Sequence, residues 1–153
     1  MEHTTHTQNT GQHDSVALLK ECNAGTKMAV SSIDDILEEV ADEKLKQVLL
    51  KSKDHHAALG NEIHALLLEY HKEDKEPNPM AKSMSWLKTN MKMSMEHSDA
   101  TVADLITDGC NMGIKSLFKY LNQYPAADPR IRALCQKLID IEEELRQDLR
   151  AYL

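Results

Sequence analysis

Histidines and cysteines placed along helical stripes are the residues of this chain whose types and spacing could support chemistry. His56 is the best placed of them, because it lies in a stripe of mostly apolar residues spaced four and three apart. The stripe consists of Leu45, Leu49, Ser52, His56, Leu59, Ile63, Leu66 and Tyr70. An imidazole binds transition metals and changes its charge near neutral pH. The favoured interpretation of His56 is a hydrogen-bonded core histidine. It is also a candidate metal ligand, with Cys22 or Cys110 as a soft co-ligand, and a pH-sensitive core histidine is the remaining alternative.

A second potential metal site is the methionine-rich segment at residues 80–96. Met84 and Met91 lie on one helical face with Met80, Leu87 and Met95, and thioethers are soft ligands that select Cu(I). Alternatively, the methionines pack a crossover helix against its neighbours or present an adaptable surface to a partner helix. Packing is the favoured interpretation of this segment.

The first three residues, Met1, Glu2 and His3, form the sharpest chemical pattern. A free amino-terminus, two amide nitrogens and the imidazole of His3 can surround Cu(II) or Ni(II) in the square-planar geometry that these ions prefer. A histidine at this position is also frequent by chance. The pattern is therefore a hypothesis for copper or nickel binding, and not a prediction of it.

No arrangement of residues in the sequence predicts catalysis. The sequence contains no Gly-x-Ser-x-Gly, phosphate-loop or dinucleotide-binding pattern. The acidic runs, among them Glu142–Glu144, lie beside Lys or Arg at helical spacings, which predicts a solvated surface with weak ion pairs. We therefore predict no catalytic residues and favour a protein that is not an enzyme.

The composition limits the partners that the protein can have. The net charge is −7 over 153 residues, which argues against binding to nucleic acid or to an anionic membrane surface. No stretch approaches the roughly 20 apolar residues of a membrane span. Three widely spaced cysteines predict buried thiols in a reducing compartment, and the polar first residues do not resemble a signal peptide. These features predict a cytoplasmic protein.

The elements that must position these residues are helices, because aromatic content is only 4% and apolar residues recur at helical spacings. A stripe matching that of His56 runs from Ser15 through Cys22 and Thr26 to Val40. Residues 1–13 lack apolar anchors and are expected to form a disordered tail. One domain follows at 14–153, with helices at about 14–41, 42–71, 80–96, 98–124 and 129–153. The expected helix caps are Asp14 or Ser15, Asp42, Ser98 or Asp99, and Asp128 before Pro129.

These helices predict an all-α fold, an antiparallel four-helix bundle made of two hairpins. The charged, proline-containing run at 72–79 (KEDKEPNP) is the linker, and the Met-rich helix lies on the long crossover between the hairpins. On the third main helix, Gly109 and Gly113 lie four residues apart on the inner face. Because glycine inside a helix costs ~1 kcal/mol relative to alanine, this pair predicts close approach of another helix.

Two stretches, EPNPMAKSMSW (Glu76–Trp86) and DGCNMGIKSL (Asp108–Leu117), are similar to an uncharacterised subfamily of the bacterial ferritin-like four-helix-bundle proteins. Together with the order of elements, the resemblance covers residues 14–153. It implies a ferritin-like fold, in which metal-binding members use two inward Glu residues and two Glu-x-x-His motifs. The corresponding positions of this chain hold Cys22 or Thr26, Ser52-x-x-His55 or Lys53-x-x-His56, Gly109 and Gly113, and Glu142-x-x-Leu145. The comparison implies that the di-iron ligands have been lost.

Three functions are compatible with this sequence. The favoured hypothesis is a non-enzymatic ferritin-like bundle that acts as a structural or protein-interaction module, with self-association as a homodimer through an apolar helix face. The alternative is a metal-binding or metal-sensing bundle that holds copper, nickel or iron through His56, Met84, Met91 or His3. A di-metal oxidase is the least favoured, because a di-iron site needs about four carboxylates and the inward positions offer roughly one.

Overall fold

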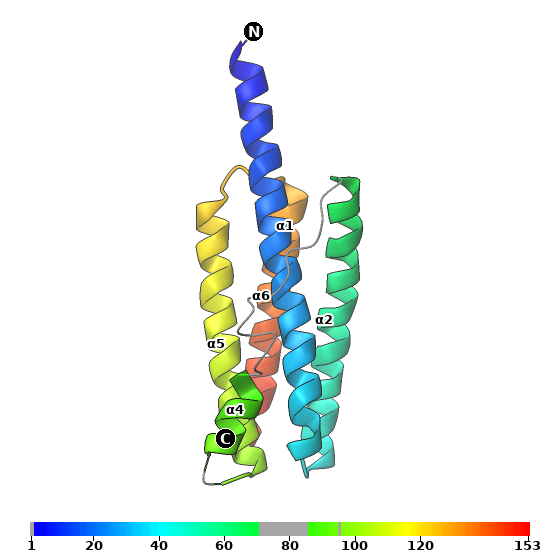
Figure 1. The fold of residues 1–153 in the computed structure, drawn as a ribbon, viewed down its shortest axis with the longest axis vertical. Coiled ribbons are helices and arrows are strands. Elements are labelled where there is room, and N and C mark those ends of the chain that lie inside the picture. Colours follow the sequence, from blue (N-terminus) through cyan, green and yellow to red (C-terminus); the bar gives the residue numbers. More distant parts are fainter. Residues whose placement is uncertain (1, 71–85, 95) are drawn as a thin grey trace.

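The structure, a computed structural model, describes residues 2–70, 86–94 and 96–153. Its α-helices are α1 (Glu2–Ile36), α2 (Glu43–Glu69), α4 (Trp86–Met93), α5 (Asp99–Gln123) and α6 (Pro129–Leu149). Short 3-10 helices follow α1 at Leu37–Glu39 and α6 at Arg150–Tyr152. Within the described residues all regular secondary structure is helical (Figure 1), which confirms the predicted all-α class. No helix in this part of the chain is long and apolar enough to cross a membrane.

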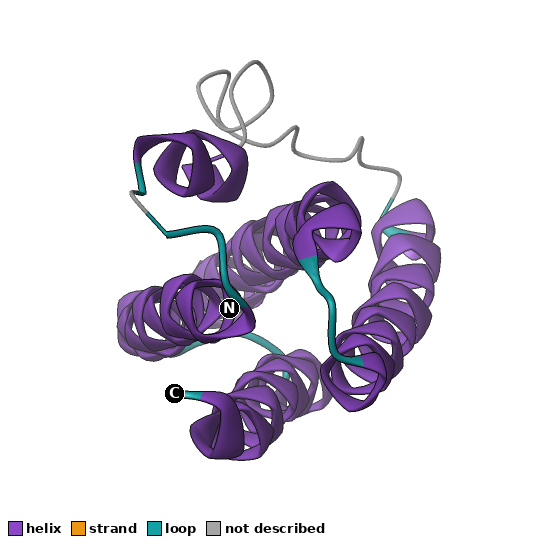
Figure 2. Cartoon of the chain, turned by 90° about the horizontal axis from the view of Figure 1, so that it is seen from below, coloured by secondary structure: helices purple, strands orange, loops and turns teal. Residues whose placement is uncertain are grey.

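The four long helices, α1, α2, α5 and α6, lie side by side with nearly parallel axes (Figure 1). Helices α1 and α2 run in opposite directions as one hairpin, and α5 and α6 form a second hairpin. In the view along the axes, α2 and α6 also pack against each other, and the short helix α4 lies outside, against α1 and α5 (Figure 2). The inward stripes of four helices therefore meet in one interior.

This interior is built from the stripes that the spacing of four and three predicts. Every member of the stripe containing His56 is buried except Tyr70, which is half-buried. The stripe of α1 is likewise buried at Ser15, Leu19, Cys22, Thr26, Ile33 and Ile36, and it continues to Val40 beyond the helix. Full burial of a Leu or Ile side chain contributes about 1.5–3 kcal/mol. Burial of these stripes is therefore the main force that holds the helices together.

Three predicted helix starts are confirmed by their caps. The carboxylate of Asp42 accepts a hydrogen bond from the amide of Leu45 at 2.9 Å, at the start of α2. The hydroxyl of Ser98 accepts from the amide of Thr101 at 3.2 Å, at the start of α5. At the start of α6, Asp128 accepts from the amide of Arg130 at 2.8 Å, with Pro129 in the first turn. Each cap satisfies an amide that has no partner inside its helix.

The start of α1 differs from the prediction. The helix begins at Glu2, so the residues predicted to be a disordered tail continue α1 and project beyond the other helices (Figure 1). Once a helix is nucleated, each added residue gains one backbone hydrogen bond at little cost. Near the point where α1 leaves the other helices, Gly11 packs closely on the α5–α6 loop, because a Cβ there would lie 3.3 Å from the carbonyl oxygen of Ala126.

Asp14 and Ser15 lie inside α1 and do not cap it, so their prediction as N-caps is wrong. They instead accept hydrogen bonds from backbone amides of the α5–α6 loop. The carboxylate of Asp14 accepts from Ala126 at 3.0 Å, and the hydroxyl of Ser15 accepts from Asp128 at 2.8 Å. These two side chains, whose types are typical of helix caps, thus accept hydrogen bonds from loop amides that lie 112 and 113 positions away in the sequence.

The other end of α1 also differs, because the helix ends at Ile36 and not near Ala41. The carboxylate of Asp99 accepts hydrogen bonds from the amides of Ala41 and Asp42 at 2.9 and 3.0 Å. Those amides are therefore not available to extend α1. The predicted helix at 80–96 corresponds to α4, while its residues 80–85 and 95 lie outside the described part of the chain.

Candidate functional site

The most polar part of the interior is centred on His56 of α2. Its side chain is 0% exposed. Its Nδ1 lies 2.8 Å from the backbone carbonyl of Ser52, with the Ser52 hydroxyl at 3.3 Å. Its Nε2 lies 2.9 Å from Oε1 of Glu142 on α6. The prediction of one hydrogen-bonded core histidine is therefore confirmed, and its main partner comes from the other hairpin.

These two contacts determine where the protons must be. A carbonyl oxygen only accepts, so Nδ1 of His56 donates to Ser52. When the Glu142 carboxylate is ionised it only accepts, and Nε2 then donates to it. An imidazole that donates from both nitrogens is an imidazolium. The geometry therefore favours a buried pair of imidazolium and carboxylate.

The pKa of His56 moves in the direction that this geometry requires. Burial is the largest single influence and works to lower the pKa, because the core solvates a cation poorly. The hydrogen bond and the negative charge of Glu142, together with the Ser52 carbonyl, outweigh burial and raise the pKa above its ordinary value. The charged form of His56 is therefore stabilised in the folded protein.

The carboxyl group of Glu142 lies beside a glycine of α5. A Cβ at Gly113 would lie 3.7 Å from the carboxyl group of Glu142, so this glycine borders the carboxylate. The side chain of Glu142 is only 13% exposed, while its neighbours Glu143 and Glu144 are exposed. The prediction of a solvated acidic run is therefore wrong for Glu142.

The sequence did contain a signal for Glu142. It continues a spacing of four and three along α6 that consists of Ile131, Cys135, Leu138, Glu142, Leu145 and Leu149. The other five members of this series are buried. A carboxylate on an inward stripe requires a partner, and the only histidine on the corresponding stripe of α2 is His56.

The two glycines of α5 differ in their surroundings. Gly113 borders a side chain of α6, whereas a Cβ at Gly109 would meet no atom within 4 Å. The prediction that both glycines permit close approach of a helix is therefore wrong for Gly109. At Gly113 an added Cβ would make ordinary van der Waals contact with the Glu142 carboxyl group.

Cys110 on α5 completes the polar centre. Burial raises the pKa of its thiol, and the charge and hydrogen bond of Glu142 raise it further, while Arg146 acts weakly in the opposite direction. A thiol held in its protonated form is a poor nucleophile. The polar centre of His56, Glu142 and Cys110 can therefore hold protons and a charge pair, but it does not activate a nucleophile.

The structure does not bring His56 and Met91 together. Both nitrogens of His56 have protein partners, and Met91 is buried in the apolar cluster beneath α4. Met84 and the side chain of His3 lie outside the described residues. Within the described part of the chain, no three His, Cys, Asp or Glu side chains are arranged to hold a metal ion. Metal binding through His56, Met91, His3 or Met84 therefore stays a hypothesis.

His55 and His64 lie at or near the surface, as predicted. His55 is partly exposed and lies 4.0 Å from Glu144. His97 is partly exposed near Glu39 at 3.7 Å, and His13 and His64 are exposed. His55 and His56 therefore point in different directions from adjacent positions, which excludes joint chelation of one ion.

The polar centre offers no room for a substrate. The cavity beside it, lined by Val48, Ser52, His55 and Leu145 among others, has a volume of about 10 Å³, which is roughly the space of one water molecule. A larger depression of about 350 Å³ lies at the far end, where α1 passes the α5–α6 loop, and is open to solvent. Its lining residues are Gly11, Gln12, Ser15, Tyr70, Ala126 and Asp128.

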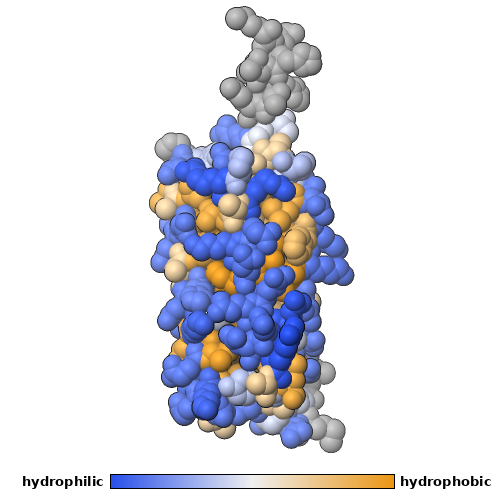
Figure 3. All heavy atoms as spheres, turned by 180° about the vertical axis from the view of Figure 1, so that it is seen from behind, coloured by the Kyte–Doolittle hydropathy of each residue, from blue (hydrophilic) through white to orange (hydrophobic). Residues whose placement is uncertain are grey.

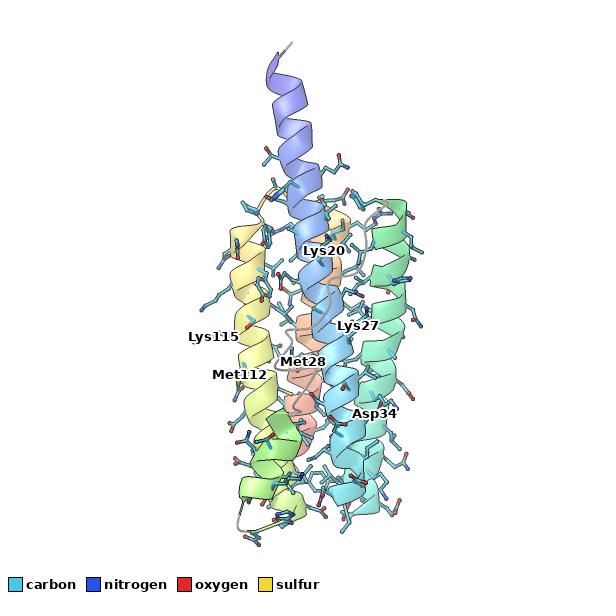
Figure 4. All side chains as sticks on the ribbon, viewed as in Figure 1. Lys20, Lys27, Met28, Asp34, Met112 and Lys115 are labelled. Atoms are coloured by element: carbon cyan, nitrogen blue, oxygen red, sulfur yellow. The ribbon has the colours of Figure 1, made fainter. Side chains whose placement is uncertain are left out.

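The outer surface of α5 has exposed apolar side chains. Met112 is 59% exposed and Phe118 is 43% exposed. Figure 4 shows Met112 and Lys115 projecting from α5 away from the other helices, while Met28 lies on α1. On the opposite face of the molecule, apolar residues reach the surface in patches between hydrophilic ones (Figure 3).

No family model, no curated protein sequence and no solved structure matches this chain. The resemblance to ferritin-like proteins therefore stays a prediction. Function has to be inferred from the buried polar centre and from the exposed surface of α5.

Proposed function

We propose that this chain is a four-helix bundle of ferritin-like topology that acts as a non-enzymatic protein-interaction module. The topology is supported by the directions of the long helices, which form two antiparallel hairpins with α4 on the connection between them (Figure 1). In proteins of this topology, chemistry takes place in the core between facing helices. The core is therefore the place to look for an activity.

One observation above all supports the non-enzymatic function. In the charge pair of His56 and Glu142, the one identified in the described core, both ring nitrogens of the histidine already have partners within the protein. The partner of Nδ1 is Ser52, and the partner of Nε2 is Glu142. Neither nitrogen keeps a lone pair for a metal ion or for a substrate proton. The adjacent cavity of about 10 Å³ admits no organic substrate. A closed pair of this kind stabilises or specifies the packing of two hairpins.

The interaction surface that we propose is the outer side of α5. Met112 and Phe118 lie less than two helical turns apart and expose much of their side chains. Exposed methionine and aromatic side chains are enriched where proteins associate. The partner that we propose is a second copy of this chain, because two-fold dimers are the commonest assemblies of soluble proteins.

Sedimentation equilibrium of the full chain tests this proposal. Wild type is expected to self-associate, and the double variant Met112→Glu, Phe118→Glu is expected to sediment as a monomer. The matched control is Leu68→Glu on α2, because Leu68 is 58% exposed and α2 lies diagonally opposite α5 (Figure 2). A wild-type protein that stays monomeric at high concentration, or a Leu68→Glu variant that dissociates equally, would contradict the proposed surface.

A further inference from the structure

The outer side of α5 changes the sign of its charge half-way along the helix. Asp104 and Asp108 lie before Met112, and Lys115 and Lys119 lie after it. All four charged residues are exposed, and none of them forms an ion pair within the described part of the chain. Figure 4 shows Lys115 projecting outward beside Met112. The surface proposed for self-association therefore also has charges that are available to a partner.

These four residues form one charged stripe. They are spaced four, seven and four positions apart, so they lie within about 60° of one another around the helix axis. The buried residues Ile106, Cys110 and Leu117 lie on the opposite side of α5. The charged stripe therefore faces directly away from the core.

The charged stripe has a single centre of symmetry in the sequence, next to Met112. Asp108 and Lys115 lie at equal distances from this centre, about 5 Å along the helix axis. Asp104 and Lys119 share the same centre and lie about 11 Å from it. If a two-fold axis passes through this centre, an antiparallel second copy of α5 places opposite charges level with each other. A parallel copy would place like charges level with each other.

The packing of a single chain does not account for this arrangement. Within one helix, each pair of like charges lies four positions apart, a spacing that is slightly destabilising. The helix dipole favours acidic residues in the first turn and basic residues in the last turn. Because α5 runs from Asp99 to Gln123, the charged stripe lies inside both terminal turns. A second helix of complementary charge accounts for all four positions.

On the basis of the proposed association through α5, we propose that two copies of this chain pair their α5 helices antiparallel, about a two-fold axis next to Met112. In this register Asp108 of each copy meets Lys115 of the other copy. Asp104 of each copy likewise meets Lys119, because the two-fold axis repeats every contact. The two Met112 side chains lie beside the axis. This apolar centre supplies affinity, whereas the flanking charges select the antiparallel orientation and its register.

Charge reversal followed by sedimentation equilibrium of the full chain tests this register. The double variant Asp104→Lys, Asp108→Lys makes the whole stripe positive, so the dissociation constant of the dimer should rise by at least about tenfold relative to wild type. Adding Lys115→Asp and Lys119→Asp to this variant exchanges the two charges. The quadruple variant should regain the wild-type dissociation constant, because every ion pair across the axis forms again with opposite polarity. Charges that serve only the helix dipole would not give this recovery.

The matched control is Asp54→Lys, Glu62→Lys, which reverses two exposed carboxylates on α2 and changes the net charge by the same amount. Its dissociation constant should stay close to that of wild type. The antiparallel register is overturned if the reversal on α5 weakens the dimer no more than this control does, or if the quadruple variant stays dissociated. These outcomes leave the proposed self-association intact when Met112→Glu, Phe118→Glu still gives a monomer. A wild-type protein that is itself a monomer overturns both proposals.

Disulfide trapping measures the orientation of the two helices directly, because the native cysteines are buried. Met112→Cys places a thiol beside the two-fold axis, next to its own copy, and should give covalent dimers on a non-reducing gel after mild oxidation. Asn122→Cys places an exposed thiol on the same side of α5, but the two copies of this thiol would lie roughly 30 Å apart in the antiparallel dimer. It should therefore give few covalent dimers. Equal trapping of the two variants, which parallel helices would produce, overturns the antiparallel register.

Discussion

The contact between His56 and Glu142 makes a prediction that separates a charged pair from an ordinary hydrogen bond. The perturbation is Glu142→Gln, which keeps the shape of the side chain and removes its charge. A glutamine amide can donate to Nε2 of a neutral His56, while Nδ1 continues to donate to Ser52. The variant therefore retains its hydrogen bonds without needing the extra proton that wild type holds.

The size and sign of the effect follow from the structure. A hydrogen bond between charged groups contributes about 1.5–3 kcal/mol, against about 1 kcal/mol for a neutral one. The pKa of His56 is raised in the folded protein, so the stability from its charged form is complete below the ordinary histidine pKa of about 6.5 and is lost as pH rises through the folded value. Near pH 6, the free energy of unfolding of wild type should exceed that of Glu142→Gln by about 1–2 kcal/mol. This corresponds to roughly 2–8 °C in melting temperature. The difference in the free energy of unfolding should narrow as pH rises through the raised pKa of His56.

Urea unfolding followed by circular dichroism at several pH values measures this difference. The matched control is Glu143→Gln, the same substitution at the next residue, where the side chain is exposed; it should leave the free energy of unfolding nearly unchanged. A difference between wild type and Glu142→Gln that does not depend on pH would refute the charged pair. The nitrogen chemical shifts of the His56 ring provide a direct check, since both nitrogens should be protonated at neutral pH.

Three further predictions concern local packing and metal binding. Gly109→Ala should raise the free energy of unfolding by about 0.5–1 kcal/mol, because a Cβ meets no atom within 4 Å there and alanine favours the helix. Gly60→Ala should raise the free energy of unfolding by less in the same urea assay, because its Cβ would lie 3.1 Å from the hydroxyl of Thr26 on α1. Ser15→Ala should cost about 1–2 kcal/mol, because it leaves the Asp128 amide without its acceptor, and a thermal melt that equals wild type would contradict this. Elemental analysis of the untagged protein, prepared without chelator, should show no transition metal bound in the core; stoichiometric copper or nickel that disappears on deletion of the first residues would instead support the pattern ending at His3.

The periodicity of the sequence was sufficient to predict the helices and their inward faces. The stripe of α2 predicted the burial of Ser52 and His56, and the caps Asp42, Ser98 and Asp128 marked three helix starts. These features are local, because helix periodicity and capping depend on residues within a turn or two of each other. The same local reasoning placed the three cysteines in the interior.

The partners of the polar residues could not be obtained in this way. Glu142 was assigned to a solvated acidic run, although it contacts His56 across 86 positions of sequence. Asp14 and Ser15 have the composition of an N-cap and serve a distant loop instead. In both cases the residue types were informative, but the group that each residue satisfies lies on another helix or loop.

The sequence by itself therefore determined which residues face inward, and tertiary structure alone decided which inward residues meet. Periodicity gives the angle of a side chain around its helix axis, but it contains no information on how far one helix is shifted along another. That shift is set by the packing of all side chains between the helices and by the lengths of their connections. It brings His56 of the first hairpin level with Glu142 of the second.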